Sequence, residues 1–323
     1  MLSQSLLGNT GFGFPTEAEV EQSLARAVSR YALSKQDRSC LKTIVPVLTK
    51  TGPGTFSLQC NQDAEKFLEV PPRFPIYWAY PRSIVPVSAD LLAETPLRVA
   101  IPVTTATDVK DKDFVELDRR HFWDALVSTM AQTGGEWPQK SDVRLPHLRT
   151  TWILDVGCGQ GWDAAPLQSF FGHRSYGIQG VNAEYLGIDY QQTEIESARG
   201  VHKDRPDLQF KIADATKLND YDFTEGKFDV VVIRHPAVFE RDGFRHIHPM
   251  WYKIFKESFN HLADGGIVIV TAYNCWEHQG ARDAMKCLGA RELFAGKNPY
   301  SAKITLYGKK HDWRDAYVSV YTR

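Results

Sequence analysis

Three glycines and one aspartate lie at a spacing that could bind a nucleotide. Asp155 ends an apolar run, and Gly157, Gly159 and Gly161 follow it at intervals of two residues. Glycine permits a tight turn and lets a ligand approach the backbone closely. A strand that leads into such a turn and then into a helix forms the usual nucleotide site of an open α/β sheet. The run therefore predicts a nucleotide-binding loop over 155–161.

The spacing of these glycines does not match a dinucleotide fingerprint. That motif places a glycine three positions after its second one, and this chain has Trp162 there. An NAD-dependent oxidoreductase therefore stays only as the weaker alternative. The pattern D-x-G-x-G-x-G from Asp155 to Gly161 instead resembles motif I of the class I S-adenosylmethionine-dependent methyltransferases.

Three further anchors lie on the predicted elements in the order that this resemblance requires. They are Gly-Ile-Asp at 187–189, Ala-Asp-Ala at 213–215, and Phe-Asp-Val-Val at 228–231 with Leu-Ala-Asp-Gly-Gly at 262–266. The resemblance covers residues 113–323, about two thirds of the chain. It implies an α/β fold with a doubly wound, mostly parallel seven-stranded sheet and an antiparallel C-terminal edge hairpin. It also implies S-adenosyl-L-methionine as cofactor and S-adenosyl-L-homocysteine as product.

Hydrophobic patterns along this region alternate between strand and helix. We expect strands at 186–189, 208–213, 228–233 and 267–272, and helices at 113–132, 162–171, 191–203, 248–262 and 276–288. Gly265 and Gly266 are expected to end the helix at 248–262. β-prone pieces near 291–295, 303–307 and 316–322 can supply the edge hairpin. Alternation of this kind predicts a parallel sheet covered by helices on both faces.

The resemblance assigns the glycine loop to the methionine part of the cofactor. Gly157, Gly159 and Gly161 would let the backbone lie against it, and Asp155 would offset its ammonium charge. Cys158 lies within the same loop and is therefore counted among the cofactor-binding residues. We expect Cys158 to be a small filler, because a nucleophilic thiol needs a nearby base.

The nucleoside part of the cofactor falls to residues at the ends of the next two strands. Asp189 can accept hydrogen bonds from two ribose hydroxyls, and Tyr190 could pack on the adenine face. Asp214 can accept from the adenine amino group while the Ala215 N–H faces a ring nitrogen. The alternative for both aspartates is helix capping or turn chemistry.

The strand expected at 228–233 is followed by Arg234, His235 and Pro236. Amino-directed members of the family usually carry an Asn or Asp here, then two prolines and an aromatic residue, so nucleobase N-methylation is disfavoured. A hydroxyl or carbon acceptor must lose a proton, and His235 is the candidate base because histidine titrates near neutral pH. The alternative for His235 is a loop histidine bonded to backbone. Arg234 could bind the cofactor or a substrate carboxylate, or pair with a neighbouring acid.

Further candidates lie near the same end of the predicted sheet. The residues that could line the acceptor pocket after the fifth strand are Tyr273, Trp276 and Glu277. His246 and His248 could join His235 at a metal ion, but no matching cluster of carboxylates or cysteines accompanies them. No metal is therefore predicted.

Composition limits the class of partner. The 323-residue chain has a net charge of −1, so no nucleic-acid partner is expected. No apolar run approaches the roughly 20 residues of a membrane-spanning helix, and the five cysteines form no C-x-x-C pair. We therefore expect a cytoplasmic methyltransferase with no membrane partner and a small-molecule substrate. A protein substrate and a non-catalytic cofactor-binding scaffold stay open.

The chain before residue 113 differs from the rest in its pattern of residues. We interpret 1–112 as an accessory α+β region and 113–323 as the methyltransferase domain. A helix is expected to about residue 34, followed by short β-prone segments at 43–49, 55–60, 76–80 and 97–103 that prolines interrupt. The aromatic stretch 74–80 could line a substrate pocket, or it could be the core of this region.

Overall fold

The computed structural model describes a central sheet with its helices and parts of the chain before it. The described residues are 29–30, 32–37, 48–52, 55–58, 122, 125–126, 129, 150–172, 183–223, 227–236, 238, 249–273, 275–298, 303–306, 309–312 and 315–323. Among them, no helix has the length and hydropathy that crossing a membrane requires.

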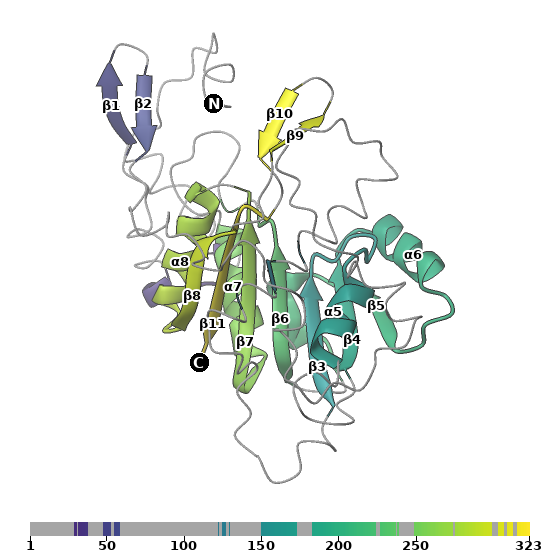
Figure 1. Ribbon diagram of the computed structural model, residues 1–323. Coiled ribbons are helices and arrows are strands. Elements are labelled where there is room, and N and C mark those ends of the chain that lie inside the picture. Colours follow the sequence, from purple (N-terminus) through teal and green to yellow (C-terminus); the bar gives the residue numbers. More distant parts are fainter. Residues whose placement is uncertain are drawn as a thin grey trace, which may run out of the picture.

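Seven strands form one sheet (Figure 1). Their spatial order is β5 (Leu208–Ile212), β4 (Ala183–Asp189), β3 (Thr151–Val156), β6 (Phe228–Arg234), β7 (Leu262–Ala272), β11 (Tyr317–Thr322) and β8 (Arg291–Lys297). All pairs from β5 to β7 are parallel, whereas β11 is antiparallel to both β7 and β8. The prediction of a mostly parallel seven-stranded sheet with an antiparallel edge is confirmed.

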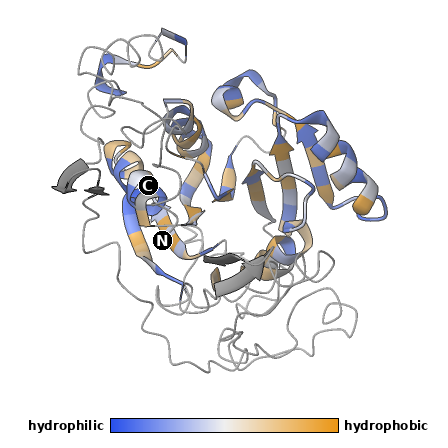
Figure 2. Cartoon of the chain, turned by 90° about the horizontal axis from the view of Figure 1, so that it is seen from above, coloured by the Kyte–Doolittle hydropathy of each residue, from blue (hydrophilic) through white to orange (hydrophobic). Residues whose placement is uncertain are grey.

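Helices cover both faces of this sheet. One face packs against α5 (Ala164–Gly172), α6 (Gln192–Val201) and the buried helical residues Phe122, Ala125 and Leu126. The other face packs against the 3₁₀ helix η5 (Ala215–Asp220), α7 (Pro249–Asn260) and α8 (Cys275–Cys287). Figure 2 shows the domain from above, with hydrophobic residues along the strands.

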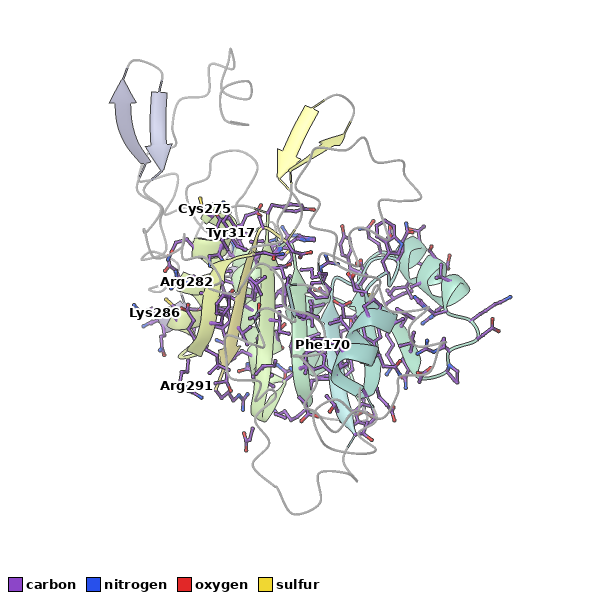
Figure 3. The ribbon with its side chains drawn as sticks, viewed as in Figure 1. Phe170, Cys275, Arg282, Lys286, Arg291 and Tyr317 are labelled. Carbon is purple, nitrogen blue, oxygen red and sulfur yellow. The ribbon has the colours of Figure 1, made fainter. Side chains whose placement is uncertain are left out.

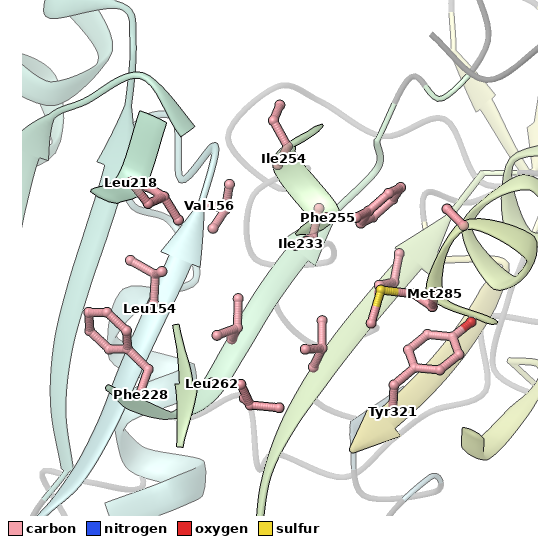
Figure 4. Close-up of a cluster of buried hydrophobic side chains, with 14 of the residues drawn as sticks. Leu154, Val156, Leu218, Phe228, Ile233, Ile254, Phe255, Leu262, Met285 and Tyr321 are labelled. Carbon is pink, nitrogen blue, oxygen red and sulfur yellow. The ribbon is translucent and has the colours of Figure 1, made fainter. Parts of the chain in front are cut away.

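Alternate residues of the central strands supply the two cores. Leu154 and Val156 of β3 face the second helix layer, and Ile153 faces the first. Figure 4 shows the second core, in which Ile233 and Phe255 lie among aliphatic side chains from several strands. Burial of each such side chain contributes about 1.5 to 3 kcal/mol, so these cores hold the strand ends in fixed positions.

The strand order reverses at β3, which lies between β4 and β6. In an open α/β sheet, ligands bind at such a reversal, outside the carboxyl ends of the strands. The register places Asp155 opposite Gly187, and Val156 opposite both Ile188 and Ile233. The ends of these three strands therefore meet at one edge of the sheet.

One prediction about the glycines after α7 is wrong. The helix ends at Asn260, and Gly265 and Gly266 lie inside β7. Gly265 has a φ of +74°, and a Cβ on Gly266 would come within 2.9 Å of the Asp229 carbonyl oxygen. The pairing of β6 with β7 shifts register at this place, so the two glycines permit an irregularity in the strand instead of ending a helix.

The remaining described strands form two separate hairpins. β9 (Lys303–Leu306) pairs with β10 (Lys309–Asp312), and β1 (Leu48–Gly52) pairs with β2 (Thr55–Leu58). The expected strands at 76–80 and 97–103, the aromatic stretch 74–80 and the domain boundary at 112 lie outside the described residues.

Candidate active site

The glycine loop after β3 is bonded to the end of β4. The N–H groups of Gly157 and Cys158 donate to the Ile188 carbonyl oxygen at 2.8 and 3.0 Å. The Gly159 N–H donates to Oδ2 of Asp189 at 3.1 Å. The loop is therefore a fixed turn that uses these amides within the protein.

The glycines of this loop differ in how closely other residues surround them. A Cβ on Gly161 would lie 2.5 Å from the ring of Phe210, so only glycine fits against β5. A Cβ on Gly157, by contrast, would meet none of the described residues within 4 Å, and the φ angles at Gly157 and Gly159 are +74° and +52°. The loop thus packs tightly on one side and presents bare backbone to open space at Gly157.

Asp155 is buried beneath the glycine loop. Its Oδ2 accepts a hydrogen bond from the Tyr185 hydroxyl at 2.6 Å. Burial and the nearby charge of Asp163 raise the pKa of Asp155 to about 7, although the bond from Tyr185 acts in the opposite direction. Asp155 therefore changes charge near neutral pH. Tyr185 was not predicted as a site residue.

Cys158 packs between the glycine loop and β4. A Cβ on Gly187 would lie 2.8 Å from the Cys158 sulfur, so the thiol fills the space that this glycine leaves. Burial and the charges of Asp155 and Asp189 raise the pKa of the thiol far above its usual value. These contacts agree with a filler.

Asp189 lies at the end of β4 with both carboxylate oxygens in use. Oδ2 accepts from Gly159, and Oδ1 accepts from the Gln191 N–H at 2.9 Å. Each oxygen has a further lone pair available to a ligand. Two exposed apolar side chains lie next to this carboxylate. Tyr190 follows Asp189 in the chain and is 75% exposed, and Ile212 pairs with Asp189 between β4 and β5 and is 44% exposed.

Asp214 caps η5, which is the alternative that the sequence left open for it. Its Oδ1 accepts from the Thr216 N–H at 2.9 Å and from the Thr216 hydroxyl at 2.7 Å. Its Oδ2 lies 4.0 Å from Nζ of Lys217. The adenine contacts of Asp214 and the half-buried Ala215 stay predictions.

Arg234 lies between two carboxylates at the end of β6. It forms ion pairs with Asp163, the residue before α5, and with Asp315, two residues before β11. The guanidinium carbon also lies 4.1 Å from the ring centroid of Phe122. Its side chain is only 8% exposed, so the structure shows the pairing with neighbouring acids that was the alternative to a substrate contact.

His235 follows Arg234 and faces the same buried acid. Its Nε2 lies 2.9 Å from Oδ1 of Asp315, and its ring stacks on Tyr273 with the centroids 4.5 Å apart. Its main-chain N–H donates to the Thr271 carbonyl oxygen at 3.1 Å. The main chain of His235 is thus bonded to the strand end, and its ring pairs with a carboxylate and, among the described residues, not with a backbone group.

The other acceptor-side candidates lie around Tyr273, which is 38% exposed. The Glu277 carboxylate accepts a hydrogen bond from the Tyr273 N–H at 3.1 Å. Figure 3 shows Cys275 and Tyr317 at the end of the sheet where β7 finishes. The side chain of Trp276 and the residues His246 and His248 lie outside what the structure describes.

The chain was compared with protein families, curated proteins and solved structures. A family of methyltransferase domains matches residues 149–313, about half of the chain. A TehB-like S-adenosylmethionine-dependent methyltransferase from Corynebacterium glutamicum is 20% identical, with a TM-score of 0.34, and the match covers 54% of this chain and 81% of that one. Magnesium protoporphyrin IX methyltransferase from Synechocystis is 15% identical, with a TM-score of 0.40, and the match covers 67% and 86%. Comparison with curated proteins gives no match.

The chain belongs to this family of methyltransferase domains. Its strand order and glycine loop are those expected from the resemblance to class I S-adenosylmethionine-dependent methyltransferases.

Proposed function

We propose that the chain transfers a methyl group from S-adenosylmethionine to an oxygen or an acidic carbon of a small molecule. When bound, the cofactor supplies a methyl group on a positively charged sulfur. The observation that carries the proposal is the pair formed by His235 and the buried Asp315, at the strand end beside the cofactor loop.

The chain's own residues fit such a cofactor. The bare backbone at Gly157 leaves room for a ligand at close range, and the Asp189 carboxylate has lone pairs for two ribose hydroxyls. Tyr190 and Ile212 offer exposed apolar surface next to that carboxylate, which suits the adenine ring. Asp189, together with Asp155 when it is ionised, places negative charge near a cationic ligand.

Methyl transfer is an in-line displacement, so alignment and exclusion of water supply much of the rate. An oxygen or carbon acceptor must also lose a proton, and a positioned base contributes about 10²- to 10⁴-fold. We assign this role to His235, whose side chain is 11% exposed. Arg234 is held by Asp163 and Asp315, so we assign it to the support of this residue.

Two features favour a small acceptor that is methylated at oxygen or carbon. Arg234, His235 and Pro236 replace the polar residue and paired prolines that amino-directed family members usually carry. The chain has a net charge of −1 and therefore lacks the excess of positive charge that binding a nucleic acid would require. The alternatives are a protein substrate and a scaffold that binds the cofactor without catalysis.

Transfer of labelled methyl from S-adenosylmethionine to panels of small hydroxyl, carboxyl, carbon and amine compounds tests the proposal. We expect label in a hydroxyl, carboxyl or carbon acceptor with the wild-type protein and none with Asp189→Ala at low cofactor concentration. Label confined to amines or to protein would contradict the proposed acceptor class. Tight cofactor binding without any transfer would favour the scaffold.

A further inference from the structure

Asp315 is fully buried two residues before β11, where Arg234 fixes its orientation. Its Oδ2 accepts a hydrogen bond from Nη2 of Arg234 at 2.5 Å, and its Oδ1 accepts from Nε of the same side chain at 3.3 Å. Two bonds from one guanidinium fork define the plane of a carboxylate. The carboxylate therefore has a set direction before any ligand binds.

The free side of Oδ1 faces the imidazole of His235, 2.9 Å from Nε2. Burial alone would raise the pKa of Asp315, but the charges of Arg234 and His235 and their hydrogen bonds hold it well below its usual value. An ionised carboxylate only accepts hydrogen bonds, so Nε2 must carry a hydrogen. The neutral ring then has its lone pair on Nδ1.

Further contacts hold this ring in place. Tyr273 stacks on one face at an interplanar angle of 29°, and the main chain of His235 is bonded to Thr271. The φ angle of His235 is +51°, a left-handed conformation that residues other than glycine seldom adopt. Such conformations cluster at functional sites, where the surroundings fix them. Among the described residues, Nδ1 has no hydrogen-bond partner.

We propose that Asp315 is a positioning residue, which fixes the Nε2–H tautomer of His235 and so presents Nδ1 as the proton-accepting atom. This inference rests on the proposed function, in which the acceptor loses a proton. The O–H or C–H bond of the acceptor breaks, the proton bonds to Nδ1, and the electron pair stays on the attacking atom. The imidazolium that forms faces the Asp315 carboxylate, which offsets its charge.

The charged and titratable groups around this ring come from several elements. They are Arg234 at the end of β6, Tyr273 after β7, Asp315 before β11, and, one contact further, Asp163 and Glu277. Asp163 and Asp315 share the guanidinium of Arg234. Formation of an imidazolium would therefore add a second positive charge to a group of two acids and one guanidinium.

Nitrogen NMR of the histidine-labelled protein tests the tautomer without any substrate. With His235→Gln to assign the resonances, we expect Nε2 to carry the hydrogen in the neutral ring of the wild type. Asp315→Asn should give a mixture of tautomers. Asp37→Asn is the matched control, because Asp37 is also buried and paired, with Lys256 at 2.6 Å, and it should leave the tautomer unchanged. A hydrogen on Nδ1 in the wild type would overturn the inference, even if Asp315→Asn failed to fold.

Kinetics on an identified acceptor separate positioning from general stability. Asp315→Asn should lower kcat by about 10- to 100-fold, less than the full contribution of a base, with affinity for S-adenosylhomocysteine unchanged. The acid limb of its pH–rate profile should move to lower pH. When His235 is already alanine, Asp315→Asn should lower kcat no further, because Asp315 acts through the histidine. Additive losses would overturn the inference, whereas methylation of no acceptor would overturn the proposed function and leave the tautomer result to decide on Asp315.

Discussion

The two parts of the candidate site differ in how far apart in the sequence their contacting residues lie. At the β3–β4 end, consecutive residues 157–159 bond to residues 188–189 at the next strand end, and glycines decide the geometry. At the β6–β7 end, Arg234 joins Asp163 and Asp315, which lie 71 and 81 positions away. The first end is a backbone structure, and the second is a cluster of buried charges.

This difference has consequences for how each end responds to change. A backbone turn depends on φ angles and on the space that a missing Cβ leaves, so steric changes should disrupt it. A buried ionic cluster depends on each partner, because removal of one leaves the other without compensation. Substitutions at the two ends should therefore separate cofactor affinity from turnover.

The largest expected effect is at the β6–β7 end. His235→Ala should slow turnover by about 10²- to 10⁴-fold if the ring is the general base. Its affinity for S-adenosylhomocysteine should be that of the wild type, because the ring pairs with Asp315 and not with the glycine loop. The rate should also lose its acid limb. Full activity, or an equal loss of cofactor affinity, would make His235 structural.

The next effect tests the backbone end by steric means. Gly161→Ala combines a φ of +70° with a Cβ 2.5 Å from Phe210, and should lower the free energy of unfolding by about 3 to 5 kcal/mol. Gly200→Ala is the matched control, because its Cβ would meet nothing within 4 Å in helix α6. That change should be neutral or stabilise by about 0.5 to 1 kcal/mol. Urea unfolding of both variants checks the contrast, and equal stability would refute it.

Much of the β3–β4 end could be predicted from the sequence, because its information is local. The D-x-G-x-G-x-G spacing placed the loop, and Asp189 was expected at the strand end where it lies. Asp163 and Asp315 were not predicted, since no local pattern links either acid to Arg234. The prediction that Gly265 and Gly266 end a helix was wrong for a related reason. Two adjacent glycines look the same in a sequence whether they end a helix or lie in an irregular strand.

A third prediction concerns the pH dependence of stability at Asp155. Its pKa is about 7 in the folded protein and about 3.9 in an unfolded chain. Between these values the folded state holds a proton that the unfolded state has lost, so stability falls as pH rises from 4 to 7. Asp155→Asn cannot ionise and can still accept from Tyr185. The variant should gain about 4 kcal/mol relative to wild type between pH 4 and pH 8.

Unfolding of both proteins across that range measures the effect. A stability difference that does not vary with pH would mean that Asp155 is ionised throughout, and the account of its burial would then be wrong.

The smallest of these effects concerns the ribose contact. Asp189→Ala should weaken S-adenosylhomocysteine binding by about 10- to 100-fold, because it removes a charged acceptor of hydrogen bonds. Asp264→Ala is the control, since Asp264 is an exposed acid near the opposite end of β7. Equal affinity in the two variants would move the ribose site away from β4.

Calorimetric titration of the wild-type protein tests most directly whether the glycine loop binds this cofactor. S-adenosylmethionine and S-adenosylhomocysteine should both bind with a saturable heat, and NAD should give none, because Trp162 replaces the glycine that a dinucleotide site requires. Saturable binding of NAD, with no response to either sulfur compound, would contradict the account.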